Sequence, residues 1–132
     1  MATFYAGKGK RIVWMSRHSP TPTQISELER LFPNHTLIVD ERSFSGANEI
    51  VGRFHAARGD EMVVVAPWTV IRELVRRGLT PIYAEMRQVP CDTEHEVAIN
   101  SKRKRCYRFV RFLWCRGVKL DLHPINPEGE RK

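Results

Sequence analysis

The chain has 132 residues and a formal net charge of +7, and 42% of its residues are apolar. This apolar content excludes a wholly disordered chain, and the length suits one domain that buries its core without disulfides. No apolar run approaches the ~20 residues that span a bilayer, and residues 1–10 lack the apolar stretch of a secretory signal. Three cysteines are too few for a disulfide framework, so we expect a cytoplasmic protein with no membrane partner.

Residues 11–89 alternate between short apolar runs and amphipathic stretches. The apolar runs are rich in β-branched residues and predict strands. These strands are, in chain order, residues 11–15, 35–40, 61–66 and 81–89. The amphipathic stretches predict helices with polar caps and outward charges. These helices run, in chain order, from Thr21 or Thr23 to about Phe32, from Ser45 to before Gly59, and from Thr69 to before Gly78.

This βαβαβαβ order with short connections predicts an α/β fold, a Rossmann-like three-layer parallel sheet with helices on both faces. The run over residues 61–66 is apolar on both faces, which suits the centre of a parallel sheet. We therefore assign residues 1–90 to a Rossmann-like core. Residues 91–132 are interpreted as a basic C-terminal extension of the same domain.

Two interpretations compete for residues 105–116 in this extension. A helix would bring apolar residues onto one face and would end at Gly117. A strand fits the high content of aromatic and β-branched residues better. We slightly favour a strand, paired with residues 118–125. Residues 90–101 are polar and predict a loop, in which Thr93 to Glu96 could form a helix capping box.

The charge of the chain is concentrated in this extension. Residues 102–119 hold eight Lys or Arg and no acidic residue, whereas the rest of the chain is close to neutral. A segment of this kind is typical of a surface that meets a polyanion such as nucleic acid or a nucleotide.

The residues that follow the predicted strands form the candidate site, because ligands of open α/β sheets bind beyond the carboxyl ends of the strands. Hydroxyls, guanidinium groups, an imidazole and an indole at this edge suit phosphates and a stacked base. The candidates are Ser16, Arg17, His18, Thr21, Gln24, Arg42, Trp68, Thr69 and Arg87. Each also has a structural interpretation as a capped turn, an ion pair or packing at the end of the sheet.

No metal or cofactor is expected. The side chains that could bind zinc lack close-pair spacing, and no carboxylate cluster suits magnesium. They are Cys91, His95, Cys106, Cys115 and His123. The run from Gly7 to Lys10 lacks the spacing of a phosphate-binding P-loop and precedes a strand where such a loop follows one.

The loop after the first strand resembles a family pattern. Ser16 is followed by His18, Thr21 and Gln24, which is similar to the Ser-His-x-x-Thr-x-x-Gln loop of small stand-alone CRISPR-associated proteins, with Arg17 inserted. Those proteins have a Rossmann-like fold related to the cyclic-oligoadenylate-sensing domains of type III CRISPR systems. The run over residues 63–82, which includes Val-Val-Val-Ala-Pro, resembles the second half of that family.

The resemblance implies that the protein binds a cyclic oligoadenylate, with tetra-adenylate favoured, and cleaves it without a metal. The ring's two-fold symmetry would match a homodimer in which each protomer supplies half a site. His18 would be the acid/base, Arg17 and Arg42 the phosphate clamps, and Trp68 the stacking platform. The implied hydrogen-bond donors are Ser16, Thr21 and Thr69.

Three other functions stay open. One is a sponge that binds the ring without cleaving it. Another is a sequence-tolerant nucleic-acid binder that uses residues 102–119, where basic and aromatic side chains are interleaved. The same segment also has a purely structural explanation. It could be a dimer interface or a sheet extension with buried aromatic residues and solvated arginines. The last is an adaptor with a catalytically inert fold.

Overall fold

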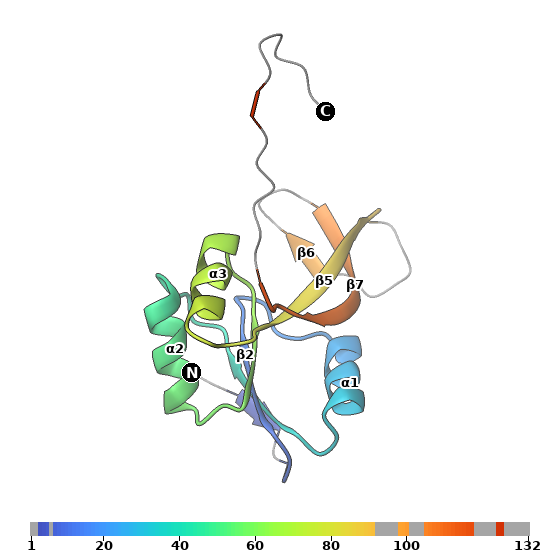
Figure 1. Ribbon diagram of the computed structural model, residues 1–132. Coiled ribbons are helices and arrows are strands. Elements are labelled where there is room, and N and C mark those ends of the chain that lie inside the picture. The colour runs from blue at the N-terminus through green and yellow to red at the C-terminus, as the bar shows by residue number, and fades with distance from the viewer. Residues whose placement is uncertain (1–2, 6, 92–97, 101–104, 118–123, 126–132) are drawn as a thin grey trace.

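The computed structural model describes residues 3–5, 7–91, 98–100, 105–117 and 124–125. These residues form a seven-stranded mixed sheet with three helices (Figure 1). The strands are β1 (Thr3–Tyr5), β2 (Arg11–Met15), β3 (Thr36–Asp40), β4 (Glu61–Val64), β5 (Ile82–Val89), β6 (Ala98–Asn100) and β7 (Arg105–Trp114). The helices are α1 (Pro22–Leu31), α2 (Ala47–Ala56) and α3 (Trp68–Arg76).

The sheet has a parallel centre and antiparallel edges. Its order is β1-β3-β2-β4-β5-β7-β6, in which β3, β2, β4 and β5 are parallel neighbours. The predicted βαβαβαβ order and the α/β class are confirmed. The four strands predicted to be parallel are parallel, but the sheet as a whole is mixed, because β1 pairs with β3 and β7 pairs with β5 in antiparallel orientation.

The helices cover opposite faces of the parallel strands. Figure 1 shows α1 on one side of the sheet and α2 with α3 on the other. The crossover from β2 to β3 moves in one direction along the sheet, and the next crossover returns past β2 to β4. Crossovers of the same hand that move in opposite directions place their helices on opposite faces. The strand order thus explains the layering.

The parallel strands are buried on both faces. Alternate residues of β2 enter two separate cores, with Val13 and Met15 packed beneath α2 and α3, and Ile12 and Trp14 packed beneath α1. All five residues of β3 are buried as well. A strand covered on both sides needs apolar residues at successive positions, which is why these segments read as continuous apolar runs.

The helix ends follow the predicted capping chemistry only in part. The N-caps of α2 and α3 are Gly46 and Pro67, which make no side-chain capping hydrogen bond, so the predicted polar starts at Ser45 and Thr69 are wrong. Thr21 is the N-cap of α1, and Gln24 completes a capping box with it. After α3, Gly78 has a φ of +84°, in the left-handed region that glycine adopts without steric cost. Its backbone N–H donates to the carbonyl of Val75, which closes the last turn of the helix.

Beyond the helices, β5 separates from β4 and continues as part of an antiparallel ribbon with β7 and β6 (Figure 1). Among the residues that the structure describes, β4 and β5 share a single register pair, Val63 with Ile82. The predicted strand is therefore confirmed over Arg105–Trp114, with β5 and β6 as its partners.

Parts of the extension differ from the prediction. The strand β6 (Ala98–Asn100) occurs where a loop is predicted. Most of the predicted partner strand over residues 118–125, namely residues 118–123, lies outside the described residues. The possible capping box from Thr93 to Glu96 lies outside them too.

The end of the ribbon carries a disulfide between Cys91 and Cys106. The cysteine count argues against a disulfide framework, and this single bridge is a local link between β7 and the residues just after β5. Cys106 is 2% exposed, and Cys115 is a free thiol. Burial raises the pKa of the Cys115 thiol.

A β-bulge separates the aromatic and the basic side chains of β7 onto opposite faces of the sheet. The register passes from Glu85 opposite Arg111 to Met86 opposite Phe109, so Val110 has no partner on β5. Directly opposed residues share a face of the sheet. One face of β7 consequently carries its aromatic side chains, and the other carries Arg108 and Arg111. The aromatic residues are Tyr107, Phe109, Phe112 and Trp114.

No helix of the described residues is long and apolar enough to cross a membrane.

Candidate functional site

Two adjoining cavities lie at the carboxyl ends of the parallel strands. They share Ser16, His18 and Val65, which follow β2 and β4. The connection after β2 leads to α1 on one face, whereas the connection after β4 leads to α3 on the other. Diverging connections of this kind leave a crevice beyond the strand ends, which is the usual ligand position in open α/β sheets.

The first cavity, called here the ribbon cavity, has a volume of about 290 Å³ and lies between the loop after β2 and the β5–β7 ribbon. It combines polar groups from the loop and α1 with apolar groups from the sheet. Its polar lining consists of Ser16, His18, Ser19, Thr21 and Gln24. Its other lining residues are Trp14, Val65, Tyr83, Ala84, Met86 and Tyr107.

The second cavity, called here the loop cavity, has a volume of about 260 Å³. Besides the three shared residues, it is lined by Arg17, Ser43, Phe44 and Pro67. It therefore joins a cationic side chain and two serine hydroxyls to the exposed edge of His18. Such a combination suits an anionic group next to the more apolar ribbon cavity.

The loop after β2 is fixed through its backbone. The Ser16 Oγ accepts a hydrogen bond from the His18 backbone N–H at 3.2 Å. The Trp14 Nε1–H donates to the His18 carbonyl at 2.9 Å. The imidazole of His18 is exposed at both cavities and has no hydrogen-bond partner among the described residues. The predicted acid/base thus stands on a rigid backbone with its ring nitrogens available.

The predicted ligands Thr21 and Gln24 form the capping box of α1. The Gln24 Oε1 accepts from the Thr21 backbone N–H at 2.9 Å, and the Thr21 Oγ1 accepts from the Gln24 backbone N–H at 3.3 Å. Both residues also line the ribbon cavity. Their spacing in the sequence is therefore explained by helix capping, and their position brings them to the site as well.

Arg42 has a local partner and lies outside the lining of both cavities. Its guanidinium donates to the Asp40 carboxylate at 2.8 Å and 2.6 Å, which is a bidentate ion pair. This pairing with Arg42 lowers the pKa of Asp40, whose side chain is buried. The predicted phosphate clamp is thus already matched to a carboxylate in this structure.

A second arginine extends this ion pair into a brace for the loop after β3. The Arg53 guanidinium lies 3.8 Å from Asp40 and donates to the carbonyls of Arg42 at 3.0 Å and Ser43 at 2.6 Å. Arg53 also pairs with Glu49. This network holds the backbone of Ser43, which lines the loop cavity, so its contribution to the site is positional.

Three further predicted ligands lie beside the cavities. Trp68 is 54% exposed, and its ring packs against that of Tyr83 with centroids 5.2 Å apart. Thr69 is the second residue of α3 and is exposed. Arg87 follows Met86 on β5, but it opens toward another hollow, of about 400 Å³, with Glu85 and Arg111. None of the three lines the two cavities.

The β5–β7 ribbon contributes side chains to the site that the sequence did not predict. Tyr83, Met86 and Tyr107 line the ribbon cavity, yet they lie far from the loop after β2 in the sequence. Alternation along β5 places Ala84 and Met86 on one face but Tyr83 on the other, so this pattern would not have grouped Tyr83 with them. Tyr107 could not be assigned by alternation either, because its face depends on the bulge at Val110.

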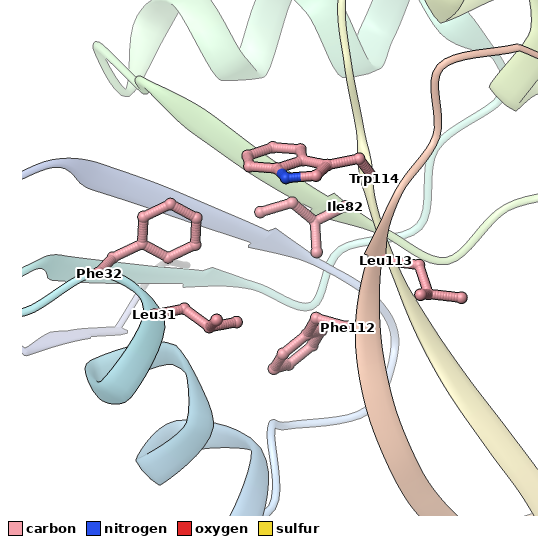
Figure 2. A pocket seen from close by; sticks show the side chains of 6 residues that line it. All are labelled: Leu31, Phe32, Ile82, Phe112, Leu113 and Trp114. Carbon is pink, nitrogen blue, oxygen red and sulfur yellow. The ribbon is translucent and has the colours of Figure 1, made fainter.

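A third hollow, of about 230 Å³, has a different character (Figure 2). Figure 2 shows Phe32 from the end of α1 facing Trp114 of β7, with Phe112 and Ile82 bordering the same space. The rings of Phe32 and Trp114 meet edge to face, with centroids 6.1 Å apart. Because its lining is apolar and includes none of the predicted site residues, we interpret it as a packing seam between α1 and the ribbon.

Within the described residues, no group of three or more His, Cys, Asp or Glu side chains is arranged to hold a metal ion. Comparison of the chain with protein-family models, with curated proteins and with solved structures finds no match.

Proposed function

We propose that the protein binds a cyclic oligoadenylate at the ribbon and loop cavities and cleaves it without a metal. The observation that carries this proposal is the exposed imidazole of His18 between a largely apolar cavity and a cavity with a guanidinium group. A nucleotide has the same division, with an apolar base beside an anionic phosphate. A Rossmann-like description of the α/β fold belongs to the same proposal.

The ribbon cavity is suited to one base. Its volume of about 290 Å³ is near the lower end of the ~300–1,000 Å³ typical of small-molecule pockets. Trp14, Tyr83 and Tyr107 contribute aromatic rings to its lining, and stacking on such rings is worth about 1–3 kcal/mol per base. A larger ring would therefore place one base in each such cavity and share its remaining parts with a second protomer.

The loop between the cavities offers donors to a phosphate. The hydroxyls of Ser16 and Thr21 act as acceptors within the protein, so their O–H groups remain to be donated. Arg17 is exposed at the loop cavity and pairs with no carboxylate among the described residues. We therefore assign the phosphate to Ser16, Thr21 and Arg17, and we assign Arg42 to the brace behind them.

The proposed reaction is an internal transfer at phosphorus. The ribose 2′ oxygen forms a bond to the adjacent phosphorus, and the bond from phosphorus to the 5′ oxygen breaks. His18 accepts the 2′-hydroxyl proton, and the leaving 5′ oxygen takes a proton from solvent. The products are a 2′,3′-cyclic phosphate and a 5′-hydroxyl. Arg17 stabilises the charge that develops on the phosphate oxygens.

The test is incubation of the protein with cyclic tetra-adenylate in EDTA, followed by chromatography of the products. We expect linear products with cyclic phosphate ends and one ring bound per dimer. His18→Ala should reduce cleavage by about 10²–10⁴-fold and retain ring binding. His55→Ala is the matched control, because His55 is exposed on α2 and lines neither cavity.

Three outcomes separate the candidate functions. Absence of both cleavage and thermal stabilisation by the ring would refute the proposal. Stabilisation without cleavage would leave a ring-binding sponge. Equal loss of cleavage in His18→Ala and His55→Ala would refute the assignment of His18.

A second candidate function is binding of nucleic acid along the basic face of the ribbon. Arg87 lies directly opposite Arg108, and neither has an acidic partner among the described residues. Like charges in this arrangement are unfavourable unless an anion is bound between them. The bulge sets these arginines on the face opposite the aromatic residues, so this candidate relies on phosphate contacts rather than on stacking.

A further inference from the structure

The side chain of Gln24 lies at the ribbon cavity with its orientation determined by the capping box. It is 4% exposed and lines the cavity. Its Oε1 accepts the Thr21 backbone N–H at 2.9 Å. Rotating the amide by 180° would set its NH₂ group against that N–H, which is a contact between two donors. The oxygen therefore faces the helix start, and the nitrogen takes the other side.

This arrangement leaves donor capacity in a buried place. The Gln24 Nε2 carries two N–H groups, and its acceptor within the described residues is the Met86 Sδ at 3.7 Å. A thioether sulfur is a weak acceptor. A buried amide with an unused N–H is costly unless a ligand or a water accepts from it. The cavity consequently presents a donor at this point and cannot present an acceptor.

We propose that Gln24 determines base specificity by donating its Nε2–H to the N1 of adenine. This inference rests on the proposed function, and it adds a specific role for the capping residue. Adenine N1 is an acceptor, whereas the N1 of hypoxanthine carries a hydrogen and is a donor. A site that offers a fixed donor accepts the first base and rejects the second, because the second would leave two donors facing each other.

The capping box allows a variant that removes the donor of Gln24 and keeps its capping acceptor. Gln24→Glu keeps an acceptor for the Thr21 backbone N–H, since glutamate is itself a common residue at this position of a capping box. The same change replaces the donor at the cavity with an acceptor. We expect the protein to remain folded, the thermal unfolding midpoint to fall because the new carboxylate is largely buried, and the affinity for cyclic tetra-adenylate to fall by about 10- to 100-fold.

Thr23→Glu is the charge-matched control. Thr23 is exposed in the first turn of α1, next to Gln24, and does not line the ribbon cavity. It adds the same negative charge to the same helix end without altering the donor. A change in affinity caused only by repulsion of the anionic ring would appear in both variants, whereas loss of the donor affects Gln24→Glu alone.

The experiment measures binding of cyclic tetra-adenylate and of the corresponding tetra-inosinate ring to the three proteins by calorimetry, with His18→Ala present in all three so that the ring is bound but not cleaved. We expect the protein with His18→Ala alone and the Thr23→Glu protein to prefer the adenylate ring, and the Gln24→Glu protein to lose or reverse that preference. Equal weakening in the two glutamate variants, or an unchanged preference in Gln24→Glu, would refute the role of Gln24 and leave ring binding intact. If the unmodified protein binds neither ring, the proposed function and this inference both fall.

Discussion

The parallel half of the sheet and the β5–β7–β6 ribbon differ in which faces of their strands are buried. In the parallel half, helices cover both faces, and β2, β3 and β4 are apolar at successive positions. In the ribbon, the two faces have different surroundings. One carries aromatic residues that reach the core beneath α1 and the ribbon cavity, and the other carries arginines in solvent.

This difference shows how a single extra residue can organise a strand. Strict alternation along β7 would mix arginines with aromatic residues on each face. The bulge at Val110 shifts the alternation, so Phe109 and Phe112 come together with ring centroids 4.7 Å apart. Arg111 meets Glu85 on the opposite face, with an N–O distance of 2.9 Å. The parallel half needs no such device, because both of its faces are apolar.

The largest effect should follow from a cavity in the parallel half. Leu74 of α3 is fully buried, whereas Leu113 of β7 is 37% exposed. We expect Leu74→Ala to lower the free energy of unfolding by about 2–5 kcal/mol. Leu113→Ala should change it by about 1 kcal/mol or less. Urea denaturation checks both variants, and equal losses would mean that the ribbon is packed as tightly as the core.

The next effect concerns the link at the end of the ribbon. The Cys91–Cys106 bridge spans 15 residues of sequence, and closing such a loop is worth about 3 kcal/mol. Cys91→Ser should lower the unfolding free energy by up to that amount, and a reducing agent should do the same to the unmodified protein. If the reducing agent also destabilises Cys91→Ser, the loss has another origin. Cys115→Ser is the control, because Cys115 is free.

Single-residue deletions in β7 test the bulge itself. Deleting Val110 joins Phe109 to Arg111 and leaves every other register pair in place, so we expect stability to change by about 1 kcal/mol or less. Deleting Arg108 would instead force Phe109 and Val110 to exchange faces. This should cost about 1–3 kcal/mol through loss of the Phe109–Phe112 contact. Denaturation curves that rank the two deletions in the opposite order would contradict the proposed role of the bulge.

The smallest effect lies on the basic face of the ribbon and tests the second candidate function. If Arg108 contacts a phosphate, Arg108→Gln should reduce the salt dependence of single-strand binding by about one unit of slope. Arg76→Gln, on an exposed residue of α3, should leave the slope unchanged. A flat salt response of the unmodified protein would exclude nucleic acid as a partner of this face.

Much of the parallel half could be predicted from the sequence. Apolar runs and capped amphipathic stretches locate four strands and three helices, because a strand covered on both faces and a helix covered on one each have a distinct periodicity. The edge of the sheet where the cavities open follows from the same pattern. His18, Thr21 and Gln24 were located there by their place after the first strand, and all three line the ribbon cavity.

The pairing partners of individual side chains could not be predicted from the sequence. Whether Arg42 faces a ligand or Asp40 depends on the path of a loop, and the bidentate contact within the protein decides it. Composition favoured a strand over residues 105–116 but did not identify β5 as its neighbour or locate the bulge. Register is a long-range property, since one unpaired residue changes the face of every residue beyond it.

The amino-acid sequence by itself therefore determined the elements of the α/β centre and the edge of the sheet at which the two cavities open, because local periodicity and capping encode both. The tertiary structure alone decided how the ribbon closes over that edge, which side of Gln24 faces the cavity, and where the basic charge points. Those features depend on contacts between residues that are distant in the chain, and no local pattern specifies them.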